Sequence, residues 1–144
     1  MGVKEWTAWR ASGRSAPRDA AVLVVDDDPV IRHLIAELLE AEGYRVAEAS
    51  HGADALRWLD DRRRAGLAPP EVVLLDMRMP IMNGWDFVAA YRLTPGPHAR
   101  ILVLTAAADA AACAAEVGAD GVLAKPFDLD ALLAAIETRA ARSR

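Results

Sequence analysis

Acidic, hydroxyl and ammonium side chains stand at the ends of four apolar runs in the sequence. They are Asp26, Asp27, Asp76, Thr105 and Lys125. If the four runs are strands of one parallel sheet, these side chains meet at one edge, and three crowded carboxylates repel one another unless a cation neutralises them. Hard oxygen ligands in this number suit Mg²⁺, which keeps several waters and is usually completed by a phosphate oxygen. The sequence therefore predicts a magnesium site beside a hydroxyl and a lysine.

The apolar runs have the character of strands in a sheet that is covered on both faces. Residues 21–25 and 72–75 are continuous apolar stretches rich in branched side chains, as parallel strands buried on both sides are. The predicted strands are Ala21–Val25, Tyr44–Ala49, Val72–Leu75, Ile101–Leu104 and Val122–Ala124. Alternation of these five strands with helical patterns predicts an α/β fold, a doubly wound parallel sheet with helices on both faces. Such a fold binds its ligand at the carboxyl ends of the strands.

Caps and apolar stripes mark the helices between these strands. Asp28 precedes Pro29, which is the pattern of an N-cap followed by proline in the first turn, so we interpret Asp28 as a cap. The helix that follows carries an apolar stripe expected to face the sheet: Ile31, Leu34, Ile35, Leu38 and Leu39. The other predicted helices are about Ala53–Arg63, Gly84–Tyr91, an alanine-rich stretch that reaches Val117, and a last helix capped by Asp128 with Leu129, Leu132, Leu133 and Ile136 on one face.

Four motifs occur in a fixed order along the chain. They are residues 22–29, with three consecutive aspartates; residues 73–80 followed by Asn83-Gly84; Leu104-Thr105-Ala106; and Lys125-Pro126-Phe127. In these motifs the chain resembles the response-regulator receiver family of two-component and phosphorelay signalling, over about residues 20–141. The resemblance implies the five-stranded (βα)5 flavodoxin-like receiver fold. It also implies a phosphoryl donor, either a sensor histidine kinase or a histidine phosphotransfer protein, and a downstream protein target.

The resemblance assigns the acidic residues their roles. Asp76 corresponds to the phospho-acceptor, whose carboxylate attacks the phosphorus of a phosphohistidine. Asp27 and Asp76 would ligate Mg²⁺ directly, Asp26 mainly through water, and Arg78 through its backbone carbonyl. Phosphoryl transfer needs in-line positioning and stabilisation of charge on the equatorial oxygens, and these roles agree with that need.

The hydroxyl and the lysine complete the site that the resemblance implies. Thr105 would donate its hydroxyl to one phosphoryl oxygen, and Lys125 would offset the charge on another. The chain has 15 arginines and only two lysines, so a lysine at this position is informative. A compact ammonium fits where a planar guanidinium does not.

Two features depart from the family pattern. Family members usually have Tyr or Phe three positions before the lysine, whereas this chain has Val122, so we expect no aromatic switch of that kind. The spacing from Thr105 to Lys125 is slightly short, which places a deletion in the fourth helix or in the loop before it. The Lys-Pro-Phe motif also implies that the Lys125–Pro126 peptide bond is cis.

Composition and charge argue against several other classes of function. A net charge of −4, with no basic stripe among aromatic residues, gives no reason to bind nucleic acid directly. No apolar stretch approaches the length of a membrane span, and no signal peptide is recognisable, so we expect no membrane contact. The single cysteine, Cys113, excludes an internal disulfide and favours a reducing compartment, so we expect the protein in the cytoplasm.

The pattern divides the chain into an arm or linker at residues 1–19 and a receiver domain at residues 20–144. We expect a stand-alone receiver without an effector domain, and we leave a homodimer open. One alternative is an interaction module that keeps the fold and signals without phosphorylation. Another is a phosphohydrolase that forms an aspartyl-phosphate on a related sheet. That enzyme would need a cap domain or a dedicated acid–base residue, and neither is visible, so we expect no turnover enzyme.

Overall fold

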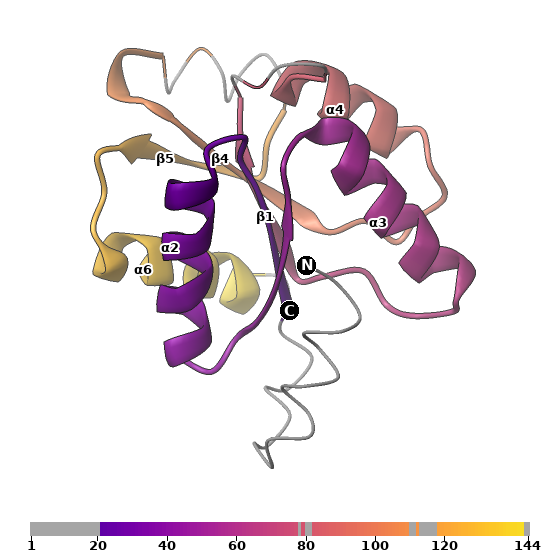
Figure 1. The fold of residues 1–144 in the computed structure, drawn as a ribbon, viewed down its shortest axis with the longest axis horizontal. Coiled ribbons are helices and arrows are strands. Elements are labelled where there is room, and N and C mark those ends of the chain that lie inside the picture. The colour runs from indigo at the N-terminus through magenta and orange to yellow at the C-terminus, as the bar shows by residue number, and fades with distance from the viewer. Residues whose placement is uncertain (1–20, 78, 80–81, 110–111, 113–117, 143–144) are drawn as a thin grey trace.

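Five parallel strands form one sheet in the computed structural model, which describes residues 21–77, 79, 82–109, 112 and 118–142 (Figure 1). The strands are β1 (Ala21–Val25), β2 (Arg45–Ala49), β3 (Val72–Asp76), β4 (Arg100–Ala106) and β5 (Gly121–Lys125). Their order in the sheet is β2-β1-β3-β4-β5, and every neighbouring pair is parallel. The predicted doubly wound α/β fold is confirmed.

Helices cover both faces of this sheet. They are α2 (Pro29–Ala41), α3 (Gly52–Arg64), α4 (Gly84–Arg92), α6 (Leu129–Arg142) and the short 3-10 helix η1 (Ala107–Asp109). Helices α2 and α6 lie on one face, and α3 and α4 lie on the other (Figure 1). The arm predicted at residues 1–19 and most of the alanine-rich helix predicted to reach Val117 lie outside the described residues. None of the helices within the described residues is long and apolar enough to cross a membrane.

The alternation of side chains along the central strands builds a core on each face of the sheet. In β1, Leu23 and Val25 join the core beneath α3 and α4, whereas Val22 and Val24 join the core beneath α2 and α6. All four side chains are fully buried. Burial on both faces is the reason that this strand reads as a continuous apolar run in the sequence.

The apolar stripe of α2 only partly faces the sheet. Ile35 and Leu39 are buried as predicted, and Ala36 is buried beside them. Ile31 and Leu34, however, are 39% and 54% exposed, so the prediction that they face the sheet was wrong. Ile35 and Ala36 directly follow Leu34 and are buried, so the helix is rotated such that its buried face lies on Ile35, Ala36 and Leu39.

Candidate functional site

The parallel register carries the predicted site residues to one edge of the sheet. Asp76, the last residue of β3, lies beside Leu104 of β4, so Thr105 projects one position further along. Lys125, the last residue of β5, lies beside Ala106 of β4. Asp76, Thr105 and Lys125 therefore lie at the carboxyl ends of three adjacent strands, β3, β4 and β5.

The carboxylates of Asp26, Asp27 and Asp76 gather where β1 and β3 end. Each offers one oxygen, and these oxygens lie within 4.8 Å of one another. Asp26 is 2% exposed, Asp76 is half-buried and Asp27 is exposed. The cluster therefore runs from the core to the surface, where a partner can reach it.

Asp26 carries the clearest electrostatic signature of the site. Its Oδ1 accepts a hydrogen bond from the backbone N–H of Asp28 at 2.9 Å. Its Oδ2 is buried and has no hydrogen-bond partner among the residues that the structure describes. Burial raises the pKa of the Asp26 carboxyl, the charges of Asp76 and Asp27 raise it further, and the Asp28 N–H and Lys125 oppose the rise. A buried acceptor without a partner is costly, so the arrangement is suited to a cation.

The donor set fits a hard divalent metal ion. Carboxylate oxygens are the ligands that Mg²⁺ prefers, and three of them converge here. One of the three residues, Asp26, also has a buried oxygen without a hydrogen-bond partner in the described part of the chain. Arg78, whose carbonyl the resemblance implies as a further ligand, lies outside the described residues.

Lys125 lies close to Asp76 without a hydrogen bond to it. Its Nζ is 3.7 Å from Oδ1 of Asp76, and the two side chains are 34% and 14% exposed. This distance is too long for a hydrogen bond, so the attraction is one between charges in a partly exposed site. Thr105 is 5% exposed on the neighbouring strand β4. The Lys125–Pro126 bond is cis, as predicted.

The segment after Asp76 is closed tightly against the start of α4. Asn83 caps this helix by accepting the N–H of Asp86 at 2.9 Å, and the N–H of Gly84 donates to the carbonyl of Met77 at 3.0 Å. A Cβ at Gly84 would lie 2.8 Å from Cα of Met77, so only glycine allows this approach. The Asn83-Gly84 motif thereby fixes the backbone that directly follows Asp76.

Sequence reasoning missed Arg32 and Glu48, which lie directly behind the acidic cluster. Arg32 donates through Nη1 to the backbone carbonyl of Asp26 and through Nε to Oε1 of Glu48, both at 2.9 Å. The side chain of His33 is 58% exposed, and its Nδ1 lies 2.7 Å from the same Oε1 of Glu48. The available sequence signal was Glu48, a carboxylate inside a predicted strand.

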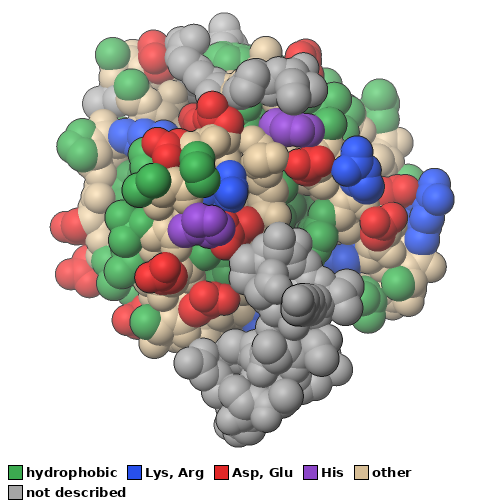
Figure 2. All heavy atoms as spheres, in the orientation of Figure 1, with side chains coloured by type: hydrophobic (Ala, Val, Ile, Leu, Met, Phe, Trp, Pro, Cys, Tyr) green, Lys and Arg blue, Asp and Glu red, His purple; other side chains and the backbone are tan. Residues whose placement is uncertain are grey.

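The basic cluster at the end of α3 is engaged within the protein. Arg62 donates to the carbonyl of Ala68 at 2.7 and 3.0 Å, and Arg63 and Arg64 both pair with Asp60. On the face drawn in Figure 2, charged side chains of both signs are interspersed. This cluster therefore gives no support for a nucleic-acid interface.

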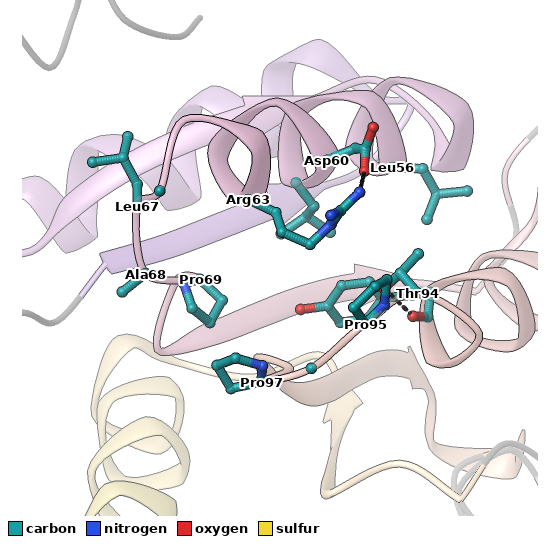
Figure 3. A pocket seen from close by; sticks show the side chains of 13 residues that line it. Leu56, Asp60, Arg63, Leu67, Ala68, Pro69, Thr94, Pro95 and Pro97 are labelled. Atoms are coloured by element: carbon teal, nitrogen blue, oxygen red, sulfur yellow. Dashed lines mark hydrogen bonds and ion pairs between the residues drawn. The ribbon is translucent and has the colours of Figure 1, made fainter.

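A cavity of about 410 Å³ lies away from the carboxylates, near the amino ends of β3 and β4 (Figure 3). It is bounded by the second half of α3 and by the loops that enter these two strands. Leu56, Leu67 and Pro97 contribute apolar walls, and the Asp60–Arg63 ion pair lies alongside (Figure 3). The chemistry-bearing residues of the sequence thus lie outside this cavity.

The parallel five-stranded sheet carries an acidic cluster, a threonine and a lysine at its carboxyl edge, where sheets of this class bind their ligands. The family described as the response regulator receiver domain matches residues 22–137, and the chain belongs to this family. The transcriptional regulatory protein KdpE of Mycobacterium tuberculosis is 38% identical over 126 residues, which cover 85% of this chain and 51% of KdpE. The chain thus spans about half the length of the curated relatives that it matches first.

Solved structures support the same assignment. Chemotaxis protein CheY4 of Vibrio cholerae has a TM-score of 0.64 and 34% identity, and the match covers 83% of this chain and 97% of CheY4. Response regulator TrrA of Thermotoga maritima, solved in complex with Mg²⁺-BeF, has a TM-score of 0.69 and 28% identity, over 83% of this chain and 97% of TrrA. The fold and the receiver family are therefore established together.

Proposed function

We propose that this receiver takes a phosphoryl group on Asp76, in a Mg²⁺-dependent transfer from the phosphohistidine of a histidine kinase or a histidine phosphotransfer protein. The phosphorylation would shift the domain between an inactive and an active state that a downstream protein reads. The observation that carries this proposal is the cluster of three carboxylate oxygens within 4.8 Å of one another, together with the buried Oδ2 of Asp26, which has no hydrogen-bond partner among the described residues. The Mg²⁺-BeF complex of TrrA supports it.

Asp76 would act as the nucleophile. One of its carboxylate oxygens would form a bond to phosphorus while the opposite phosphorus–nitrogen bond breaks, and the electron pair of that bond would stay on the leaving imidazole nitrogen. The side chain of Asp76 is 14% exposed, so it is open enough for a donor and sheltered enough to stay fixed in direction. Positioning of this kind provides most of the rate in phosphoryl transfer.

The neighbouring residues would stabilise charge on the transferred group. Asp27 and Asp76 would hold Mg²⁺ directly, and Asp26 would hold it mainly through water. When bound, Mg²⁺ neutralises charge on the phosphoryl oxygens. Lys125 would pair with another phosphoryl oxygen, because its ammonium already lies 3.7 Å from the acceptor. Thr105 would donate its hydroxyl to a further oxygen.

Exposed apolar side chains beside the cluster favour a protein as the phosphoryl donor. Val30, Ile31 and Leu34 of α2 are 74%, 39% and 54% exposed, and the helix starts directly after the aspartates of the site. An apolar surface next to a reactive carboxylate is typical of a face that a protein partner covers. We expect Leu34→Ser to slow transfer from the cognate kinase and to leave labelling by acetyl phosphate unchanged.

Incubation with Mg²⁺ and acetyl phosphate, followed by intact mass measurement, tests the proposal. We expect one added phosphoryl group on the parent protein and none on Asp76→Asn. Asp61→Asn serves as the matched control, because Asp61 is exposed on α3, outside the acidic cluster. Normal labelling of Asp76→Asn would refute the assignment of the acceptor.

The same experiment separates the two alternative functions. An interaction module that signals without phosphorylation would gain no mass, even though it folds and binds Mg²⁺. A phosphohydrolase would release more phosphate than there is protein, whereas we propose a receiver that is not a turnover enzyme. Phosphate release measured with protein well below the donor concentration distinguishes these outcomes.

A further inference from the structure

The side chain of Arg32 lies behind the acidic cluster rather than in it. It belongs to the first turn of α2 and is only 14% exposed. One nitrogen donates to the backbone carbonyl of Asp26 and another to Oε1 of Glu48 on β2, each at 2.9 Å. The guanidinium therefore ties the first ligand residue of the cluster to the neighbouring strand.

The carbonyl contact completes the set of restraints on Asp26. The N–H of Asp26 donates to the carbonyl of Ala49 at 3.1 Å, and its Oδ1 accepts from the N–H of Asp28 at 2.9 Å. Arg32 holds the remaining polar backbone atom, the carbonyl oxygen. Because Oδ2 has no hydrogen-bond partner among the described residues, its direction depends on these three restraints.

The charge of Arg32 is matched by Glu48. The Glu48 side chain is 6% exposed, and it accepts from Arg32 and lies 2.7 Å from Nδ1 of His33. The negative charge of this buried carboxylate offsets the positive charge of the guanidinium, so Arg32 repels a cation at the three aspartates less strongly. Its planar fork can also hold two acceptors in a fixed relation, which a lysine cannot do.

We propose that Arg32 is a positioning residue for the metal site: by bridging the Asp26 carbonyl to Glu48, it holds the Asp26–Asp27 turn in the geometry that Mg²⁺ binding needs. The role rests on the function proposed above. Arg32 would orient the residues that bind the metal ion and would not bind the ion itself.

A purely electrostatic role for Arg32 predicts the opposite result when the residue is removed. Loss of a positive charge makes the surroundings of the cluster more negative, which attracts a divalent cation more strongly. Loss of a positioning residue misaligns the ligands and weakens binding. The sign of the change in Mg²⁺ affinity therefore separates the two roles.

Isothermal titration of the full chain with Mg²⁺ measures that sign. We expect Arg32→Met to raise the Kd about ten-fold, in the range found when residues that orient metal ligands are removed. Arg57→Met is the matched control. Arg57 and Arg32 both line a cavity of about 330 Å³, and Arg57→Met removes the same charge as Arg32→Met. The side chain of Arg57, however, is 70% exposed and pairs with Asp54. We expect this control to stay within about two-fold of the parent, because an exposed and screened charge contributes little.

Two further variants keep the proposal testable if Arg32→Met does not fold. Arg32→Lys should recover part of the affinity, because an ammonium can reach one of the two acceptors. Glu48→Gln keeps the shape of the side chain that holds Arg32 and removes its charge, so we expect this variant to bind Mg²⁺ more weakly as well. A Kd for Arg32→Met equal to or lower than that of the parent overturns the proposal. If Arg32→Met does not fold, a parent-like Kd for both Arg32→Lys and Glu48→Gln overturns the proposal instead.

Amide hydrogen exchange gives a readout that needs neither metal nor phosphorylation. Without Mg²⁺, Arg32→Met should speed exchange of the Asp26 amide relative to the Val24 amide of the same strand. Equal acceleration of both amides would mean general loosening and would overturn the positioning role. Failure of the parent protein to accept a phosphoryl group from acetyl phosphate would instead reject the proposed function. The exchange result would still test the positioning role of Arg32, because it does not depend on phosphorylation.

Discussion

Strands β3 and β5 each end on a residue of the site, but their surroundings differ. β3 is the central strand, and its residues Val72 to Leu75 are at most 1% exposed. β5 lies at the edge of the sheet and, within the described part of the chain, pairs only with β4; each of its five residues is partly exposed. Core packing therefore fixes Asp76, the proposed acceptor, whereas Lys125 depends on the pairing of β5 with β4. Folding itself places the proposed nucleophile, and the charge proposed to stabilise the phosphoryl group comes from a less tightly packed edge strand that can shift at lower cost in free energy.

Truncation of one leucine in each strand tests this comparison at the level of stability. Leu74 of β3 is fully buried, and Leu123 of β5 is partly buried against the same core. We expect Leu74→Ala to lower the free energy of unfolding by about 2–5 kcal/mol, and Leu123→Ala by roughly half as much, because less contact is lost. Urea unfolding midpoints at unchanged m-value measure both losses. Equal losses would mean that β5 is held as firmly as β3.

Substitution of Lys125 tests the same comparison at the level of chemistry. We expect Lys125→Met to slow labelling by acetyl phosphate at saturating Mg²⁺ by on the order of 100-fold, as the loss of one charge-stabilising group does. The free energy of unfolding should change by less than about 0.5 kcal/mol, because the pair with Asp76 is long and partly exposed. Lys125→Arg controls for charge alone. A large loss of stability would show that the lysine holds the edge strand in place.

The strands that the sequence predicted best are the ones with the strongest burial. β1 agrees at both ends with the predicted range Ala21–Val25, because the apolar run and the buried segment coincide. β4 and β5 are longer than predicted, at Arg100–Ala106 and Gly121–Lys125. The extra residues are polar or small; they pair through their backbone, which hydropathy does not report. Lys125, expected just after its strand, is therefore the last residue within it.

Contacts between distant elements set the limit of prediction for the site. The acidic cluster could be predicted, since strand ends in a parallel sheet share one edge. The bridge from Arg32 to Glu48 could not, because it depends on how α2 is rotated against β2, 16 residues further along the chain. The apolar stripe favoured a rotation that would bury Ile31 and Leu34, and the structure leaves both exposed. Small side chains such as Ala36 shift the buried face of a helix without a strong signal in the sequence.

Substitution of Asp26 has the smallest expected effect among these predictions. It measures the free-energy cost of a buried charge at the end of the central strands. Burial raises the pKa of its carboxyl above the ordinary value of 3.8, so the folded state holds this proton more tightly than the unfolded state does. Stability of the metal-free protein therefore falls as the pH rises from about 3.8 through the raised pKa, and the penalty persists at neutral pH. We expect Asp26→Asn to increase the free energy of unfolding at pH 7 by about 1 kcal/mol without Mg²⁺.

Thermal unfolding between pH 4 and pH 8, with and without Mg²⁺, checks this expectation. Saturating Mg²⁺ should stabilise the parent by on the order of 1–3 kcal/mol, because it binds only the folded cluster, and Asp26→Asn should lose most of that gain. Asp28→Asn is the control: Asp28 is exposed and caps α2 by accepting the N–H of Val30 at 2.9 Å, and asparagine caps equally well. A lower stability of metal-free Asp26→Asn at pH 7 would show that the protein itself compensates the buried charge. The argument for a cation at Oδ2 would then fail.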